Sequence, residues 1–250
     1  MGICKLCNKE SKLRKSHIIS NFLYKNIRGS DGSIITTSLN KLKSGILDKK
    51  DLNKKQWDKL LCNECEKLLN DNYENYFCNF LHGGFGKTNT PLVKKLHFFE
   101  NEKIKYYEIS DVNYLSIKNT ILSILWRCSV SNSIPNFNLG DKHNEILRKI
   151  IHNKEITDES DYTIQTYSLC ELKDKIPFDP IGLMIEPFKL KKDGAFYYYF
   201  LTNGLLFVIT VSSHKRVIDP DFYMSKNNIM RIIILTDNEL PFIQKLLGLR

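Results

Sequence analysis

Two C-x-x-C pairs constrain the N-terminal part of this chain more than any other feature. Cys4 and Cys7 form the first pair, and Cys62 and Cys65 form the second. A C-x-x-C turn directs both sulfurs to one metal ion, and four thiolates complete the tetrahedron that zinc prefers, because soft sulfur matches this ion. The segment between the pairs can fold out as an insertion. The sequence therefore predicts one structural zinc ion that joins the two ends of an N-terminal module.

A redox-active cysteine pair is the main alternative to a metal site. A thioredoxin-like pair follows a strand and precedes a helix, and Cys4 lies too close to the start of the chain for that arrangement. The odd number of seven cysteines also favours metal binding over disulfides in a reducing compartment. Four thiolates leave no open coordination position, so the zinc is expected to stabilise the fold. Cys78, Cys128 and Cys170 have apolar neighbours and are expected to be buried.

The excess of positive charge lies at the cysteine-bearing end of the chain. The formal net charge is +9; residues 1–60 contain 14 Lys and Arg against 5 Asp and Glu, whereas residues 61–250 contain 23 of each kind. A basic field confined to one region favours a polyanion such as nucleic acid as the partner. The alternative is a well-solvated lysine-rich surface.

The chain shows no segment that would direct it to a membrane. Its start, MGICKLCNKE, lacks the apolar segment of a signal peptide, and no stretch approaches the roughly 18 apolar residues of a membrane span. We therefore expect a cytoplasmic protein with no membrane partner. With 42% hydrophobic residues, a chain of 250 residues can bury the core of one large domain or of two smaller ones.

The pattern of apolar residues predicts helices first and then mostly strands. Helices with apolar residues at three- and four-residue spacing are expected over 65–81, 113–130, 142–152 and 239–247. Strands are expected over 105–109, 162–169, 183–190, 196–201, 205–211 and 229–235. Asn203-Gly204, between two of these strands, is the strongest hairpin signal. This order predicts an α+β fold with a mostly antiparallel sheet.

A glycine-rich stretch after the first predicted helix marks a boundary between two domains. We expect residues 1–82 to form the zinc-binding module and residues 90–250 to form an α+β domain for sensing, specificity or oligomerisation. The stretch reads GGFGKT over Gly83–Thr88, but a P-loop requires glycine at position 81, where this chain has Leu81. We therefore interpret it as a linker.

A histidine between the two cysteine pairs carries a resemblance to a known family. His17 lies in the segment KSHII, and Leu60-Leu61 leads into the second pair, which enters a predicted helix. Over roughly residues 1–80, this order resembles the four-cysteine branch of the HNH endonucleases, which are His-Me finger nucleases with a ββα-metal core. The resemblance implies a zinc-stapled ββα module that hydrolyses phosphodiester bonds in nucleic acid, with double-stranded DNA as the expected substrate and RNA as the less favoured alternative.

The resemblance also implies the roles of individual residues. It implies His17 as the general base, since an imidazole titrates near neutral pH and can take a proton from water. Glu66 and Asp58 would hold a catalytic Mg²⁺ or Mn²⁺, for which carboxylate oxygens are suitable ligands. Lys12, Arg14 and Lys15 are expected to contact the phosphates of the nucleic acid.

Two departures from the family pattern leave a second hypothesis open. The family usually has Asp or Glu immediately before the histidine, where this chain has Ser16, and Trp57 occupies the place of its central asparagine. The alternative is a catalytically degenerate zinc module that binds nucleic acid or a protein partner without cleaving. Glu66, Asn70 and Glu74 follow at four-residue steps, so they either line the metal site together or form a solvated helix face.

The second part of the chain resembles known proteins only loosely. Its long predicted helix, with Trp126-Arg127, is loosely similar to companion regions of prokaryotic defence proteins that begin with an HNH domain. That likeness implies a role in anti-phage defence, with a second copy of the chain or a defence-system protein as a further partner. Arg127, on an otherwise apolar helix, is expected either to form a buried ion pair with an acidic residue or to bind an anionic ligand.

Overall fold

The computed structural model of this chain consists of two compact units, each assembled from three separate segments. Unit 1 comprises Met1–Phe22, Lys55–Thr90 and Asn113–Asp158, and unit 2 comprises Leu23–Lys54, Pro91–Val112 and Glu159–Arg250. The structure describes residues 1–25, 27, 33–46, 48–51, 57–83, 94–98, 104–134, 137–212 and 222–249.

The two units do not follow the predicted division into residues 1–82 and 90–250. Asn113–Asp158 groups with the N-terminal residues, although it lies in the middle of the chain. The predicted linker over Gly83–Thr88 lies outside the described residues except for Gly83. The assignment of separate roles to 1–82 and 90–250 stays a prediction.

Unit 1 begins with two small antiparallel ribbons. Strand β1 (Gly2–Ile3) pairs with β2 (Glu10–Ser11), and β3 (Leu13–His17) pairs with β6 (Trp57–Cys62). The β3–β6 register sets Ser16 opposite Asp58 and His17 opposite Trp57. Residues directly opposite each other in an antiparallel pair share one face of the ribbon, and neighbours along a strand point to opposite faces. Ser16 and Asp58 therefore share one face, and His17 and Trp57 share the other.

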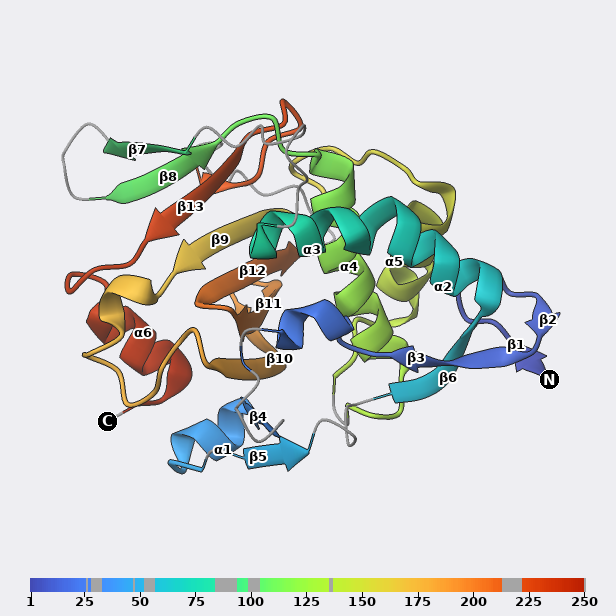
Figure 1. Cartoon of the computed structure of the whole chain (residues 1–250), viewed down its shortest axis with the longest axis horizontal. Helices are drawn as coiled ribbons and strands as arrows, with labels where there is room; N and C mark the ends of the chain where they lie inside the picture. Colours follow the sequence, from blue (N-terminus) through green and yellow to red (C-terminus); the bar gives the residue numbers. More distant parts are fainter. Residues whose placement is uncertain are drawn as a thin grey trace. The chain divides into compact units, whose positions relative to one another are not determined.

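A continuous helical segment follows β6 without a loop (Figure 1). It consists of α2 (Asn63–Leu69), a π-helical turn η3 (Asn70–Glu74) and α3 (Asn75–His82). Gly83 ends it with a left-handed φ of 67°, which glycine adopts without steric cost. The predicted helix over 65–81 is thus confirmed in type and extent, but its π-helical middle was not predicted.

Helix α4 (Tyr114–Val130) is the central element of unit 1 and packs against α3, η3 and α5 (Asp141–Asn153). The Asn113 side chain caps its start by accepting a hydrogen bond from the Ser116 N–H over 2.8 Å. The predicted amphipathic helix is in fact buried on almost all sides, including Lys118 and Arg127. A helix enclosed in this way must satisfy the polar groups of its own side chains.

Unit 2 is built on one large sheet. Among the described residues, its nine strands run in the order β5-β4-β10-β11-β12-β9-β13-β8-β7. In Figure 1, β5 lies at the bottom and β7 at the top. The strands are β4 (Ser33–Thr37), β5 (Asp48–Asp51), β7 (Lys94–Phe98), β8 (Lys105–Ile109), β9 (Ile164–Ser168), β10 (Leu183–Lys192), β11 (Ala195–Thr202), β12 (Leu205–Val211) and β13 (Met230–Ile234). Of the strand pairs that the described residues form in this sheet, β4–β10 and β9–β13 are parallel and the others are antiparallel. The prediction of an α+β fold with a mostly antiparallel sheet is confirmed.

The remaining helices are short, and two of them pack with the sheet of unit 2. Helix α1 (Leu39–Lys43) contacts α6 (Leu240–Leu247) and β10, and their apolar side chains join one core cluster with Leu183 and Leu201. The part of the chain that the structure describes also contains two 3₁₀ turns, η1 (Asn21–Tyr24) and η4 (Cys170–Leu172).

The predicted hairpin at Asn203-Gly204 is confirmed. Thr202 pairs with Leu205 across it, and φ is 52° at Asn203 and 75° at Gly204. Two consecutive positive φ values are the mark of a type I′ turn, for which Asn-Gly is the favoured sequence. Among the described residues, no helix has the length and apolar character that crossing a bilayer requires.

Candidate metal centre and basic groove

Four cysteine sulfurs of unit 1 converge on one point. The thiols of Cys4, Cys7, Cys62 and Cys65 all lie within 4.8 Å of one another, and all but Cys7 are buried. Four sulfurs at this spacing can surround one metal ion such as zinc, which binds thiolates at about 2.3 Å in tetrahedral geometry. The two pairs, distant in the sequence, therefore form a single candidate metal centre.

Backbone hydrogen bonds build this centre at one end of the β3–β6 ribbon, where the start of β3 pairs with the end of β6. The first pair lies in the turn between β1 and β2, where Asn8 has a left-handed φ of 59° and its N–H donates to the Cys4 carbonyl over 2.9 Å. The second pair lies where β6 ends and α2 begins. The Lys5 N–H donates to the Leu60 carbonyl over 2.9 Å, so the two turns are bonded directly to each other.

Burial and hydrogen bonding shift the thiol pKa values in different directions. Burial raises the pKa of Cys62 to about 11 and raises that of Cys65 further. At Cys4, burial is outweighed by hydrogen bonds to the sulfur from the backbone of Cys7, Cys62 and Leu6, and the pKa is lowered. A bound zinc ion would hold all the thiols deprotonated, because coordination favours the thiolate far more strongly than burial opposes it.

Glu66 occupies the position directly after the last cysteine and is half-buried. Its Oε1 atom is buried and has no hydrogen-bond partner among the described residues. Burial raises the pKa of Glu66; Ser16 and the guanidinium groups of Arg127 and Arg14 oppose that rise, and Glu74 adds to it. The structure therefore brings Ser16, which precedes His17, to the carboxylate that follows Cys65.

His17 is half-buried at the end of β3. Its carbonyl oxygen accepts a hydrogen bond of 2.8 Å from the Arg127 guanidinium. Ser16, its neighbour, is fully buried, and the Ser16 hydroxyl oxygen accepts the Leu61 N–H over 3.2 Å. Strand alternation thus directs Ser16 toward Glu66 and His17 to the opposite face of the ribbon.

The Asp58 carboxylate, near the start of β6, accepts hydrogen bonds from two backbone N–H groups. Its Oδ1 accepts the N–H of Lys59 over 2.7 Å, and its Oδ2 accepts the N–H of Asn132 over 3.2 Å. Both carboxylate oxygens are therefore engaged with backbone donors. Its predicted role as a metal ligand stays a prediction.

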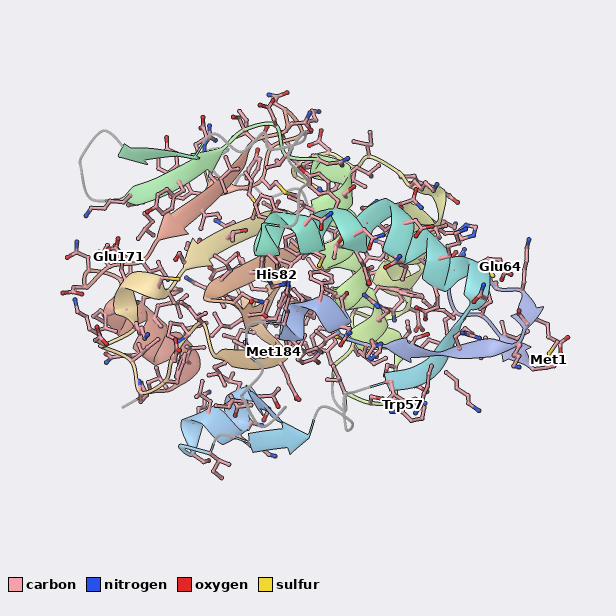
Figure 2. The ribbon with its side chains drawn as sticks, viewed as in Figure 1. Met1, Trp57, Glu64, His82, Glu171 and Met184 are labelled. Atoms are coloured by element: carbon pink, nitrogen blue, oxygen red, sulfur yellow. The ribbon has the colours of Figure 1, made fainter. Side chains whose placement is uncertain are left out.

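A basic groove runs beside Glu66. Lys12, Leu13, Arg14, Lys15, Asn63 and Glu66 line it, and its volume is about 410 Å³. The three basic side chains are exposed. Lys15 also lies over the ring of Trp57, with its ammonium 3.7 Å from the ring centroid, and Trp57 is 39% exposed. Figure 2 shows Trp57 at the N-terminal end of β6 and Glu64 at the start of α2.

Arg127 and Glu74 form the buried ion pair that one sequence hypothesis expected. Their side chains are 2% and 16% exposed and are joined by a 2.7 Å contact. The Ser20 hydroxyl donates to the same Glu74 oxygen over 2.7 Å. The interpretation that Asn70 and Glu74 lie on a solvated helix face is therefore wrong for Glu74. Asn70 is exposed, as that interpretation expects.

The cysteines outside the metal centre are not all buried. Cys128 is buried as expected, but Cys78 is half-buried and Cys170 is exposed. Cys170 lies in the short turn after β9. Its apolar neighbours Leu169 and Leu172 are buried, whereas the Cys170 side chain is not.

Comparison with known proteins returns no relative. The chain matches no family model, no curated protein and no solved structure.

Proposed function

We propose that unit 1 is a metal-dependent nuclease module that hydrolyses phosphodiester bonds in DNA. The observation that carries the proposal is the buried Oε1 atom of Glu66, which has no hydrogen-bond partner among the described residues and borders a groove lined by Lys12, Arg14 and Lys15. A buried carboxylate oxygen without a partner is costly unless a cation takes the place of one. The basic side chains supply the complementary attraction for the phosphates of the substrate.

The donor set at Glu66 suits Mg²⁺ or Mn²⁺. Such ions prefer oxygen ligands, and Mg²⁺ is commonly held by one or two carboxylates together with water and substrate phosphates. Glu66 offers one carboxylate oxygen, and the neighbouring Ser16 hydroxyl is neutral. When bound, the cation would supply positive charge against the phosphate oxygens as they gain charge.

The protein's own residues would perform the remaining tasks. His17 would accept the proton of the attacking water, a task for which the imidazole group is generally suited. Lys12, Arg14 and Lys15 would hold the backbone of the nucleic acid along the groove. The four cysteines, with zinc, would hold the β3–β6 ribbon against α2, so that His17 and Glu66 come from elements fixed to each other.

The experiment that tests this proposal is plasmid nicking by the full chain. We expect conversion of supercoiled to open circular plasmid with Mg²⁺ or Mn²⁺, and none when divalent cations are withheld while the zinc content stays at one equivalent. Cleavage that is equally fast without an added divalent cation would contradict a catalytic cation at Glu66.

A specific observation favours a second candidate, a module that binds nucleic acid without cleaving it. Both oxygens of Asp58 accept backbone N–H groups, and the Ser16 hydroxyl is buried against the Leu61 N–H. Strand alternation also directs His17 to the other face of the ribbon from Ser16, which lies at Glu66. Of the positions expected to hold the cation, Glu66 alone then offers a free oxygen among the described residues. Salt-sensitive binding of DNA, with no cleavage under any divalent cation, would decide for this candidate.

A further inference from the structure

The guanidinium of Arg127 connects three elements of unit 1. From α4 it donates to the His17 carbonyl at the end of β3 over 2.8 Å and to the Ser20 hydroxyl just beyond that strand over 2.9 Å. It donates to Glu74 in η3 over 2.7 Å and to the Ser123 carbonyl of its own helix over 3.3 Å. The side chain is 2% exposed.

The cost of burying Arg127 indicates that its role is to fix the geometry between the elements it joins. Removing a guanidinium from water is costly, and apolar residues of similar size stabilise a core at least as well. The best-attested gain from a buried ion pair is a fixed geometry between the elements it joins. Arg127 is suited to that role because its planar fork carries five N–H donors in rigid directions.

The π-helical turn η3 is an independent observation at the same place. The turn spans Asn70–Glu74 and lies between two α-helical segments. A π turn is rare and appears mostly as a single turn inside an α-helix, frequently at functional sites. Here the turn ends at Glu74, the residue that receives Arg127 and Ser20. The helix therefore carries an irregularity at the residue that pairs with Arg127.

We propose that Arg127 is a positioning residue, which fixes the strand end carrying His17 against the helix that carries Glu66. This inference rests on the proposed nuclease function of unit 1. The guanidinium binds the His17 carbonyl on one side and Glu74, two helical turns after Glu66, on the other. It thereby sets the backbone from which the imidazole projects. Helix α4 is then a required part of the active module, although it lies outside residues 1–82.

The test compares the full-length Arg127→Lys variant with wild type. Lysine keeps the charge and most of the length, but its single ammonium cannot reach the His17 carbonyl, Ser20 and Glu74 from fixed directions. We expect kcat for plasmid nicking to fall by on the order of 10- to 100-fold, since small misplacements of a catalytic group have effects of this size. We expect KM for DNA and the zinc content to stay within about twofold of wild type.

Two further variants keep the test informative if Arg127→Lys folds poorly. Glu74→Gln retains an oxygen for Arg127 and is expected to lower kcat in the same direction. Arg231→Lys is the control, since Arg231 forms an ion pair with Glu108 in unit 2, with side chains 18% and 24% exposed, and its kcat should equal that of wild type. A kcat for Arg127→Lys and Glu74→Gln equal to that of Arg231→Lys would overturn the inference.

A readout that needs no cleavage separates this inference from the proposed function. We expect the NMR signals of the His17 imidazole, assigned with a His17→Gln variant, to shift in Arg127→Lys and Glu74→Gln and to be unchanged in Arg231→Lys. Unchanged His17 signals in the folded Arg127→Lys protein would overturn the positioning role. If the His17 signals shift in the variants but the wild-type protein does not nick plasmid, the positioning role stands and the proposed nuclease function is wrong.

Discussion

The backbone N–H of Cys62 donates a hydrogen bond to the sulfur of Cys4 over 3.3 Å. This bond joins the two C-x-x-C pairs directly, at the point where β6 ends and α2 begins. A sulfur that accepts N–H groups is stabilised as a thiolate, which is the form that binds zinc. The metal centre and the β3–β6 ribbon therefore stabilise each other.

Loss of one cysteine is expected to cost both the metal and stability. In Cys62→Ser the bound zinc should fall from one equivalent to a small fraction, because structural zinc affinity is part of the folding free energy. Elemental analysis of the purified protein measures the zinc, and thermal unfolding should show a lower Tm. Cys170→Ser, which changes an exposed cysteine of unit 2, is the control and should retain both. Full zinc occupancy in Cys62→Ser would contradict the assignment of the centre.

Arg148 is expected to support the metal centre from outside. Its guanidinium donates to the carbonyl of Leu6, between Cys4 and Cys7, over 2.7 Å, and also binds the Glu145 carboxylate. Groups that orient a metal site from outside the ligand set typically change affinity by 10- to 100-fold. We expect Arg148→Ala to lower zinc affinity by about tenfold in competition with a chromophoric chelator.

The exposed Lys149 provides the control for that experiment. It lies next to Arg148 on α5, and its side chain is 60% exposed. Lys149→Ala should bind zinc with wild-type affinity. Equal affinities for the two variants would show that the Leu6 contact does not support the centre.

The basic groove predicts a specific salt dependence of DNA binding. Each phosphate contact that is removed should lower the slope of log K against log salt by about one. Lys12→Ala and Arg14→Ala together should therefore weaken binding at every salt concentration and reduce the slope by about two. Fluorescence anisotropy with a labelled duplex measures both quantities. Lys191→Ala with Lys192→Ala, two exposed lysines of β10 in unit 2, should leave the slope unchanged, and a slope lowered equally by that pair would contradict the groove.

Glu66 is expected to determine the response to divalent cations. Glu66→Ala should abolish nicking at Mn²⁺ concentrations that saturate the wild type, while DNA binding without a divalent cation persists. Asp71→Ala removes an exposed carboxylate from the same helical segment and should keep the wild-type Mn²⁺ dependence. If Glu66→Ala nicks plasmid with an unchanged Mn²⁺ titration, the cation is held elsewhere.

Local patterns predicted the features that depend on neighbours in the sequence. The two C-x-x-C pairs, the helices at 65–81 and 113–130 and the turn at Asn203-Gly204 each follow from a short segment, and the structure has them in place. The convergence of the cysteines could also be predicted, because thiolates with this spacing have few uses other than a shared metal.

Features that depend on distant contacts could not be predicted in the same way. Two interpretations of Arg127 are open from the sequence alone, and only the packing of α4 against η3 and β3 selects Glu74 as its partner. The hydrogen bond from the Asn132 N–H to Asp58 joins residues 74 apart in the sequence, so no local pattern could indicate it. The π turn of η3 has no clear signal in the sequence, since Asn70–Glu74 continues a regular helical pattern.

Plasmid nicking by the His17→Ala variant tests most directly whether the zinc centre supports a nuclease site. We expect the variant to retain one equivalent of zinc and the salt-dependent binding of DNA, and to lose nicking by at least about 100-fold, the lower range for loss of a general base. His152→Ala, which changes another histidine of unit 1, should nick at the wild-type rate. Nicking by His17→Ala at the wild-type rate, with zinc retained, would contradict the account.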